Sequence, residues 1–183
     1  MNNSELAEKD APAALAWIAG ILQSHEIPFQ VSGGLAAAVY GSTRPLVDID
    51  IDVPDEHLAT LAELVAGHVV FGPARYRDGE WDLMLLTVNF AGYDIDLGGV
   101  TGAKVLDRAA QTWVPMAADL ESAVRLRLFG VEVPVIAKEA LIAYKRRLDR
   151  EVDRMDVAAM EAASKSGTTA AWNGCQGGTN GGE

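Results

Sequence analysis

Residues 31–54 read VSGGLAAAVYGSTRPLVDIDIDVP and contain the most informative pattern of the chain. A short apolar segment before it can end a strand at Ser32. Gly33 and Gly34 then form a turn without side chains, and residues 35–40 have the composition of a short helix. The pattern therefore predicts a strand, a tight turn and a helix within a few residues of each other.

Residues 47–53 alternate between apolar and acidic side chains, which predicts a strand with Asp48, Asp50 and Asp52 on one face. Three carboxylates on one face repel each other unless solvent or a cation covers them. The alternation is thus compatible with the solvated face of an edge strand. It is equally compatible with a divalent cation bound by oxygen ligands.

The glycine turn favours the second interpretation. Without side chains at Gly33 and Gly34, a phosphate can approach the backbone N–H groups at the start of the following helix. An anion site and a cation site within one unit suit a metal-bound nucleoside triphosphate. The stretch lacks the third glycine of the dinucleotide fingerprint and the Gly-Lys-Ser/Thr of a Walker loop.

The turn and the acidic strand together resemble a known signature. Gly33-Gly34, thirteen residues and then Asp48-Ile49-Asp50-Ile51 are similar to the motif of the nucleotidyltransferase superfamily, which has the DNA polymerase β-like fold. Gly41 and Arg44, between the two halves, resemble small bacterial members related to AbiEii-type toxin–antitoxin systems. The resemblance implies an α/β (α+β) fold, with a twisted mixed sheet and packed helices.

A further carboxylate is expected from a neighbouring strand, because one strand cannot surround two metal ions. Residues 93–97 read YDIDL and place Asp94 and Asp96 on one face of a second acidic strand. We prefer Asp96, which is flanked by Ile95 and Leu97, and we keep Asp94 as the alternative. The resemblance implies that Asp48, Asp50 and Asp96 are both catalytic and metal-binding, with two Mg²⁺ ions or, alternatively, Mn²⁺.

The nucleotide-binding residues that we predict are Ser32, Gly33, Gly34, Arg44 and Lys145. Lys145 lies in the apolar stripe of a C-terminal helical segment, so its ammonium group must reach either a phosphate or an acid such as Asp149. This segment also resembles the C-terminal helices of the same small nucleotidyltransferases. The positions that match are Leu141, Lys145, Arg150, Asp153 and Asp156.

The resemblance implies an enzyme that binds ATP or another nucleoside triphosphate. It would transfer the nucleoside monophosphate to a hydroxyl of RNA, a protein or a small molecule and release pyrophosphate. One alternative is a catalytically inactive nucleotide-binding module that pairs with a cognate toxin or antitoxin. Another is a sugar-nucleotide transferase, which also uses Asp-x-Asp with a divalent metal.

Composition limits the other classes. The 183 residues carry a formal net charge of −11, which argues against stable binding of double-stranded DNA. No apolar run approaches the roughly 20 residues that span a bilayer, so we expect no membrane association. The single Cys175 excludes an internal disulfide, and a cytoplasmic protein fits best.

The domain organisation predicted from the sequence is one nucleotidyltransferase-like domain at residues 1–163, with a helical segment at 137–163. Residues 164–183 are rich in glycine and polar residues and are predicted to be a disordered tail. Of the segments between the motifs, residues 72–79 are expected to form a loop. Residues 82–89 are expected to form a strand buried on both faces, and residues 104–110 a weak helix.

Overall fold

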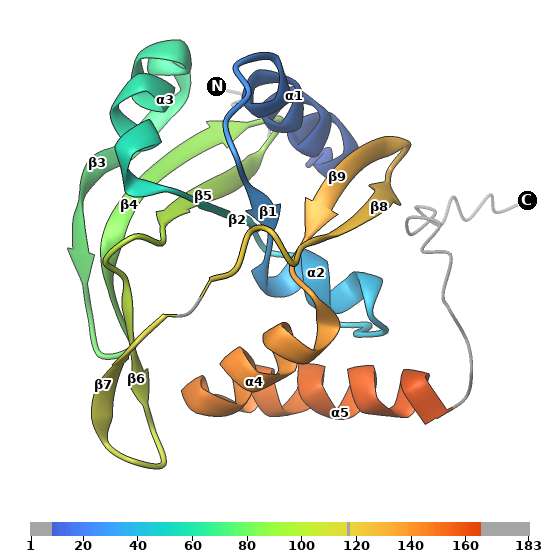
Figure 1. Cartoon of the computed structure of the whole chain (residues 1–183). Helices are drawn as coiled ribbons and strands as arrows, with labels where there is room; N and C mark the ends of the chain where they lie inside the picture. Colours follow the sequence, from blue (N-terminus) through green and yellow to red (C-terminus); the bar gives the residue numbers. More distant parts are fainter. Residues whose placement is uncertain (1–8, 117, 166–183) are drawn as a thin grey trace, which may run out of the picture.

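The computed structural model of the chain describes residues 9–116 and 118–165, and its centre is a curled mixed sheet (Figure 1). The strands are β1 (Gln30–Val31), β2 (Ile49–Val53), β3 (Val69–Arg77), β4 (Trp81–Phe90), β5 (Tyr93–Gly99), β6 (Lys104–Asp107), β7 (Thr112–Pro115), β8 (Val124–Leu128) and β9 (Val131–Val135). They pair in the order β7-β6-β4-β5-β2-β1-β9-β8, and β3 pairs with β4 off this path. The predicted fold class, a twisted mixed sheet with packed helices, is confirmed.

Five α-helices in the described ranges cover this sheet. They are α1 (Ala11–Ser24), α2 (Gly33–Val39), α3 (Leu58–Leu64), α4 (Lys138–Leu148) and α5 (Glu151–Lys165), with short 3₁₀ turns at Asp55–His57 and Ala66–His68. Figure 1 shows α1 and α3 above the sheet, while α4 and α5 lie against its other end. None of the described helices is long and apolar enough to cross a membrane.

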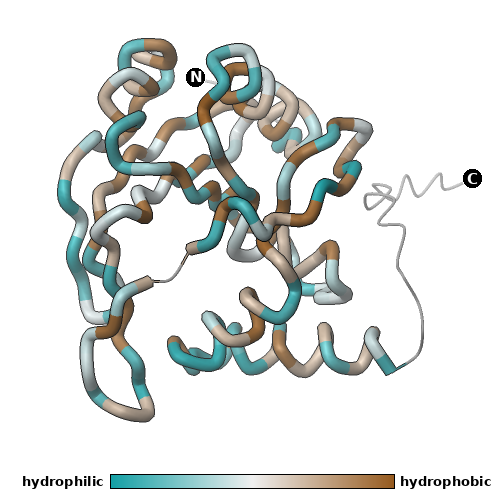
Figure 2. Tube along the Cα trace, viewed as in Figure 1, coloured by the Kyte–Doolittle hydropathy of each residue, from teal (hydrophilic) through white to brown (hydrophobic). Residues whose placement is uncertain are grey.

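The alternating sequence of the central strands sorts their side chains onto two faces. Ile49, Ile51 and Val53 of β2 are buried, as are Ile95 and Leu97 of β5. These residues pack with the buried side of α1 in one hydrophobic core. Figure 2 shows the alternation of brown and teal along these strands. The acidic residues between them therefore lie on the opposite face of the sheet.

A buried group of charges joins α4 and α5 to the segment before β2. Lys145 Nζ lies 2.9 Å from Asp156 Oδ2 and 3.4 Å from Asp153 Oδ1, and all three side chains are nearly inaccessible to solvent. Asp156 also accepts a hydrogen bond from Ser42 Oγ at 2.7 Å and pairs with Arg44 at 3.3 Å. Lys145 was predicted to reach either a phosphate or an acid, and in the structure it pairs with acids. Asp149 is not one of them, because it ends α4 and pairs with Arg154.

Three of the predicted secondary-structure segments are wrong. Residues 72–77 do not form a loop, because β3 continues through them and pairs with β4. Residues 104–107 form β6 instead of a helix, because they pair with β4 and β7. Strand β4 is buried mainly on one face, whereas we expected burial on both. In all three cases pairing or exposure set by distant residues outweighs the local pattern.

The C-terminal segment contains two helices, and the second extends beyond the predicted boundary. Asp149 adopts a left-handed conformation, with φ 46°, between α4 and α5. Helix α5 reaches Lys165, so Ser164 and Lys165 are helical although both were predicted to belong to the tail. The rest of the predicted tail, residues 166–183, lies outside the described residues.

The buried charges predict an unequal response to two substitutions. Asp156→Ala leaves Lys145, Arg44 and Ser42 without a shared acceptor, and we expect the free energy of unfolding to fall by about 3 kcal/mol. Glu161→Ala, which removes an exposed partner of Arg146, should change it by less than about 1 kcal/mol. Urea unfolding monitored by circular dichroism measures both. Equal losses would show that the buried group does not stabilise the fold.

Candidate active site

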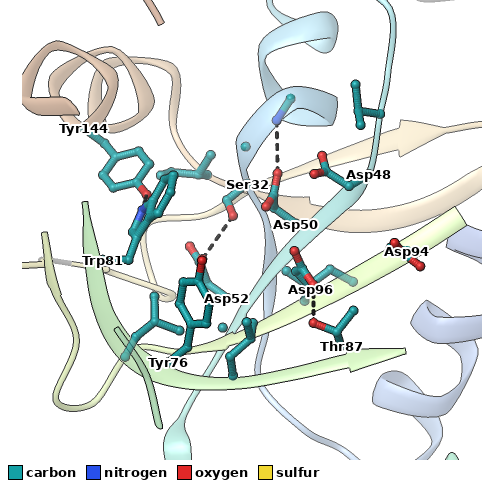
Figure 3. Close-up of a pocket in the computed structure, with 18 of the residues that line it drawn as sticks. Ser32, Asp48, Asp50, Asp52, Tyr76, Trp81, Thr87, Asp94, Asp96 and Tyr144 are labelled. Carbon is teal, nitrogen blue, oxygen red and sulfur yellow. Dashed lines mark hydrogen bonds between the residues drawn. The ribbon is translucent and has the colours of Figure 1, made fainter. Parts of the chain in front are cut away.

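A cavity of about 750 Å³ lies over the acidic face of the sheet. It is lined by residues of β2, β3, β4 and β5, by the two glycines, and by α4 (Figure 3). Gly33 and Gly34 form the first turn of α2, which therefore begins two residues earlier than predicted. All of the predicted site residues line the cavity: Ser32, Gly33, Gly34, Arg44, Asp48, Asp50, Asp96 and Lys145, together with the alternative Asp94. Residues from distant parts of the sequence thus meet at one cavity.

The glycine turn is packed directly against Asp50. The Gly34 N–H donates a hydrogen bond to Asp50 Oδ2 at 3.3 Å, and the Ser32 N–H donates to the Asp50 carbonyl at 2.9 Å. Gly33 has φ +58°, and a Cβ atom there would lie 1.7 Å from Asp50 Oδ2. Glycine is therefore required at position 33, both by the backbone conformation and by the closeness of the carboxylate.

The parallel pairing of β2 with β5 places Asp96 beside Asp50. Thr87 Oγ1 donates a hydrogen bond to Asp96 Oδ1 at 2.6 Å, which orients the carboxylate within the cavity. Asp94 is exposed and accepts a hydrogen bond from Asn89 at 2.7 Å. The register supports Asp96 as the third carboxylate, although the assignment stays a prediction.

Electrostatic repulsion is strong among these carboxylates. Burial, together with the charges of Asp48 and Asp96, raises the pKa of Asp50 to about 7, although the Gly34 hydrogen bond lowers it. Burial also raises the pKa of Asp96, and the charges of Asp48 and Asp94 add to this against the opposing effect of Thr87. Two carboxyl groups with raised pKa values in one cavity are typical of a functional site.

Asp52 has a different environment from its neighbours on β2. It accepts hydrogen bonds from Gln30 Nε2 at 2.7 Å and from Ser32 Oγ at 3.0 Å, while burial raises its pKa. Ser32, predicted to bind nucleotide, thus donates its hydroxyl to a buried carboxylate. The Oε1 atom of Gln30 is buried without a hydrogen-bond partner among the described residues.

The two predicted nucleotide-binding cations reach the cavity but are already paired. Arg44 and Lys145 both contact Asp156, at 3.3 and 2.9 Å. Burial raises the pKa of Asp156, but hydrogen bonds from Ser42, Lys145 and Arg44 outweigh this and hold the pKa below its usual range. A role in phosphate binding therefore stays a prediction for both cations, and it would require them to share their charge with Asp156.

Trp81 and Tyr144 also line this cavity, and neither was predicted from the sequence. Trp81 Nε1 donates a hydrogen bond to the Tyr144 hydroxyl at 2.7 Å, and Arg150 lies 4.6 Å from the Trp81 ring centroid. Burial raises the pKa of Tyr144. The period of β4 could have placed Trp81 on the same face as Thr87. Nothing in the sequence indicates that α4 brings Tyr144 next to it.

The donor set fits a cation that prefers oxygen ligands. Within residues 9–116 and 118–165, no three His, Cys, Asp or Glu side chains form a ready-made metal site. The three carboxylates nevertheless line one cavity, and burial together with their mutual repulsion raises the pKa of Asp50 and Asp96. A divalent cation would relieve that repulsion, and carboxylates are the ligands that Mg²⁺ and Mn²⁺ accept.

A family profile described as aminoglycoside-2''-adenylyltransferase matches residues 14–160. No curated protein sequence matches the chain at a significant level. The profile covers most of the described residues, including β1 to β9 and the predicted site.

Solved structures share the fold at low sequence identity. A candidate nucleotidyltransferase of Thermotoga maritima, TM1012, has a TM-score of 0.59 and 18% identity, covering 90% of this chain and 99% of that one. The lincosamide antibiotic adenylyltransferase LnuA, bound to lincomycin, has a TM-score of 0.56 and 14% identity, covering 85% and 98%. ANT(2'')-Ia in complex with adenylyl-2''-tobramycin has a TM-score of 0.55 and 16% identity, covering 86% and 91%.

The raised pKa of Asp50 predicts how stability depends on pH in metal-free buffer. The folded chain holds a proton at Asp50 up to pH about 7, whereas the unfolded chain releases it near pH 4. The free energy of unfolding should therefore decrease as the pH rises from 4 to 7. In Asp50→Asn this decrease should be smaller, by on the order of 2 kcal/mol.

Urea titrations at several pH values in EDTA measure this difference. Glu63→Gln, on the exposed side of α3, serves as the control and should follow the parent chain. If the free energy of unfolding of Asp50→Asn changes with pH as that of the parent chain does, Asp50 is not the group responsible for the decrease.

Proposed function

The chain belongs to the aminoglycoside-2''-adenylyltransferase family, and we propose that it transfers the adenylyl group of ATP to a hydroxyl of a small-molecule acceptor in a Mg²⁺-dependent reaction. As a nucleotidyltransferase, it moves a nucleoside monophosphate from a nucleoside triphosphate to a hydroxyl. One observation carries the finer proposal. Asp48 and Asp50 on the β2 side of the cavity face Asp96 on the parallel strand β5.

Asp48, Asp50 and Asp96 would hold the divalent ions, most simply Mg²⁺. When bound, these ions would offset the charge of the triphosphate and lower the pKa of the acceptor hydroxyl. The properties of the carboxyl groups themselves support this assignment. Burial and the repulsion from Asp48 and Asp96 together raise the pKa of Asp50 and cost folding free energy, and a bound cation would offset this cost.

The chain's own residues contribute positioning and proton transfer. Asp96 has one oxygen bonded to Thr87, and its raised pKa suits it to accept the proton of the acceptor hydroxyl. Gly33 lets the Asp50 carboxylate approach the backbone more closely than any side chain at this position would permit. Arg44 and Lys145 add positive charge on the side of the cavity near the glycine turn.

A small molecule is the acceptor that the comparisons favour over RNA or protein. LnuA is described bound to lincomycin, and ANT(2'')-Ia is described in complex with adenylyl-2''-tobramycin. The acidic lining of this cavity favours an acceptor with positive charge. The competing hypothesis is a catalytically inactive binding module, such as a toxin–antitoxin component, and an activity assay separates it from the proposal.

The assay is pyrophosphate release from ATP in the presence of Mg²⁺ and a panel of hydroxylated amines. Asp48→Asn and Asp50→Asn should each reduce the rate by at least about 100-fold, because each removes a ligand charge. The fold should be retained or slightly stabilised, since a repelling charge is lost. EDTA should abolish release, and Glu63→Gln should keep it. Near-normal turnover in either variant would remove the metal assignment.

A second pair of variants tests the third carboxylate. Asp96→Ala should abolish transfer and weaken Mg²⁺ binding, because Asp96 is paired in register with Asp50. Asp94→Ala should leave a measurable rate, since Asp94 is exposed and bonded to Asn89. Steady-state rates and Mg²⁺ titrations decide between them. The opposite ranking would assign the third ligand to Asp94.

A further inference from the structure

The floor of the cavity has two chemically different halves. The half formed by β2 and β5 carries the carboxylates. The half formed by β3 and β4 carries apolar side chains, which we call the apolar strip: Phe71, Tyr76, Leu83 and Leu85. Strand pairing makes the strip continuous, because Tyr76 pairs with Leu83 and Leu85 pairs with Gly98 of β5.

The apolar strip is not part of the hydrophobic core. Phe71 and Tyr76 retain 40% and 37% of their exposure, and their rings lie 6.4 Å apart at 83°. The residues of β4 on the other face, Leu86 and Val88, are fully buried in the core beneath the helices. Partly exposed apolar side chains gathered inside a cavity are the usual lining of a ligand site.

Gly98 joins the two halves and leaves the floor between them open. A Cβ atom at this position would meet nothing closer than the Ile51 carbonyl oxygen at 3.9 Å. Gly98 is paired with Asp52 on one side and with Leu85 on the other. A ligand can therefore extend from the carboxylates onto the apolar strip across bare backbone.

The direction of the reaction indicates which substrate lies on the strip. In nucleotidyl transfer the attacking and leaving oxygens lie roughly in line on opposite sides of the phosphorus. The glycine turn lies beside Asp50 and Arg44 lies beside Gly34, while Lys145 shares Asp156 with Arg44, and this cationic side suits the leaving pyrophosphate. The acceptor must then approach from the opposite side, over β5, β4 and β3.

We propose that the acceptor is an amphipathic cation, with its reactive hydroxyl at Asp96, its ammonium group beside the carboxylates of β2 and β5, and an apolar portion on the apolar strip. This inference rests on the proposed function, which assigns the two sides of the cavity. The arginines of β3 do not oppose a cation here, because Arg75 and Arg77 pair with Asp82 on the other face, at 2.7 and 3.8 Å. Because Leu83 and Leu85 belong to the apolar strip, they favour an acceptor with an apolar group over a purely hydrophilic polycation.

A matched pair of probes tests the proposal by isothermal titration calorimetry without ATP. 1-Deoxynojirimycin is a hydroxylated ring amine, and its N-butyl derivative differs only by the alkyl chain. We expect the butyl chain to tighten binding by about tenfold, as partial burial of four carbons predicts. Equal affinity, or no binding of the butyl derivative, would overturn the proposal.

Substitutions at adjacent positions of β4 test whether the butyl chain binds on the apolar strip. Leu83→Ser and Leu85→Ser should abolish the advantage of the butyl chain, whereas Met84→Ser, on the opposite face, should keep it. Urea unfolding confirms that each variant is folded. If Leu83→Ser instead weakens ATP binding and leaves the butyl advantage intact, the strip holds the nucleobase and the proposal is wrong.

The binding experiment is independent of catalysis. An advantage of the butyl chain without any pyrophosphate release would retain the amphipathic-cation site and reject only the proposed transfer. Active transfer to hydroxylated amines with no butyl advantage would retain the proposed function and reject the acceptor class.

Discussion

The parallel pairing of β2 with β5 is the constraint on which the site depends. It places Asp50 beside Asp96 and Ile51 beside Leu97, so one face of the pair packs into the core while the other carries the carboxylates. A shift of one residue in register would turn the acids into the core. Burial of the apolar side chains of β2 and β5 therefore stabilises an arrangement in which the carboxylates on the other face repel one another.

This arrangement disfavours the ionised form of the carboxyl groups in the cavity, as their raised pKa values show. Asp50 is partly buried beside two other acids, and its pKa is raised to about 7 even though the Gly34 N–H donates a hydrogen bond to it. Asp52 is also buried, yet Gln30 and Ser32 satisfy it. Asp52 is therefore stabilised by hydrogen bonds from the protein. Asp50 and Asp96 face the cavity, where a bound cation would offset their charge.

The C-terminal helices contribute a second electrostatic unit beside the first. Lys145 lies between Asp153 and Asp156, and Arg44 reaches the same Asp156 from the segment before β2. Because Arg44 and Lys145 also line the cavity, this unit connects the position of α4 and α5 to the charge around the substrates. The same helices bring Tyr144 to Trp81 and so form a wall of the cavity.

The elements with a local signal could be predicted from the amino-acid sequence. The period of two in β2 and β5 sorts apolar from acidic residues, and the double glycine indicates a turn that tolerates no side chain, as the contact between Gly33 and Asp50 shows. The tertiary structure alone decided which strands pair, so β3 and β6 form where a loop and a helix were expected. It also decided the partners of Lys145 and the position of the apolar strip. Pairing, burial and charge compensation join residues far apart in the chain, and no local pattern encodes which of them will meet.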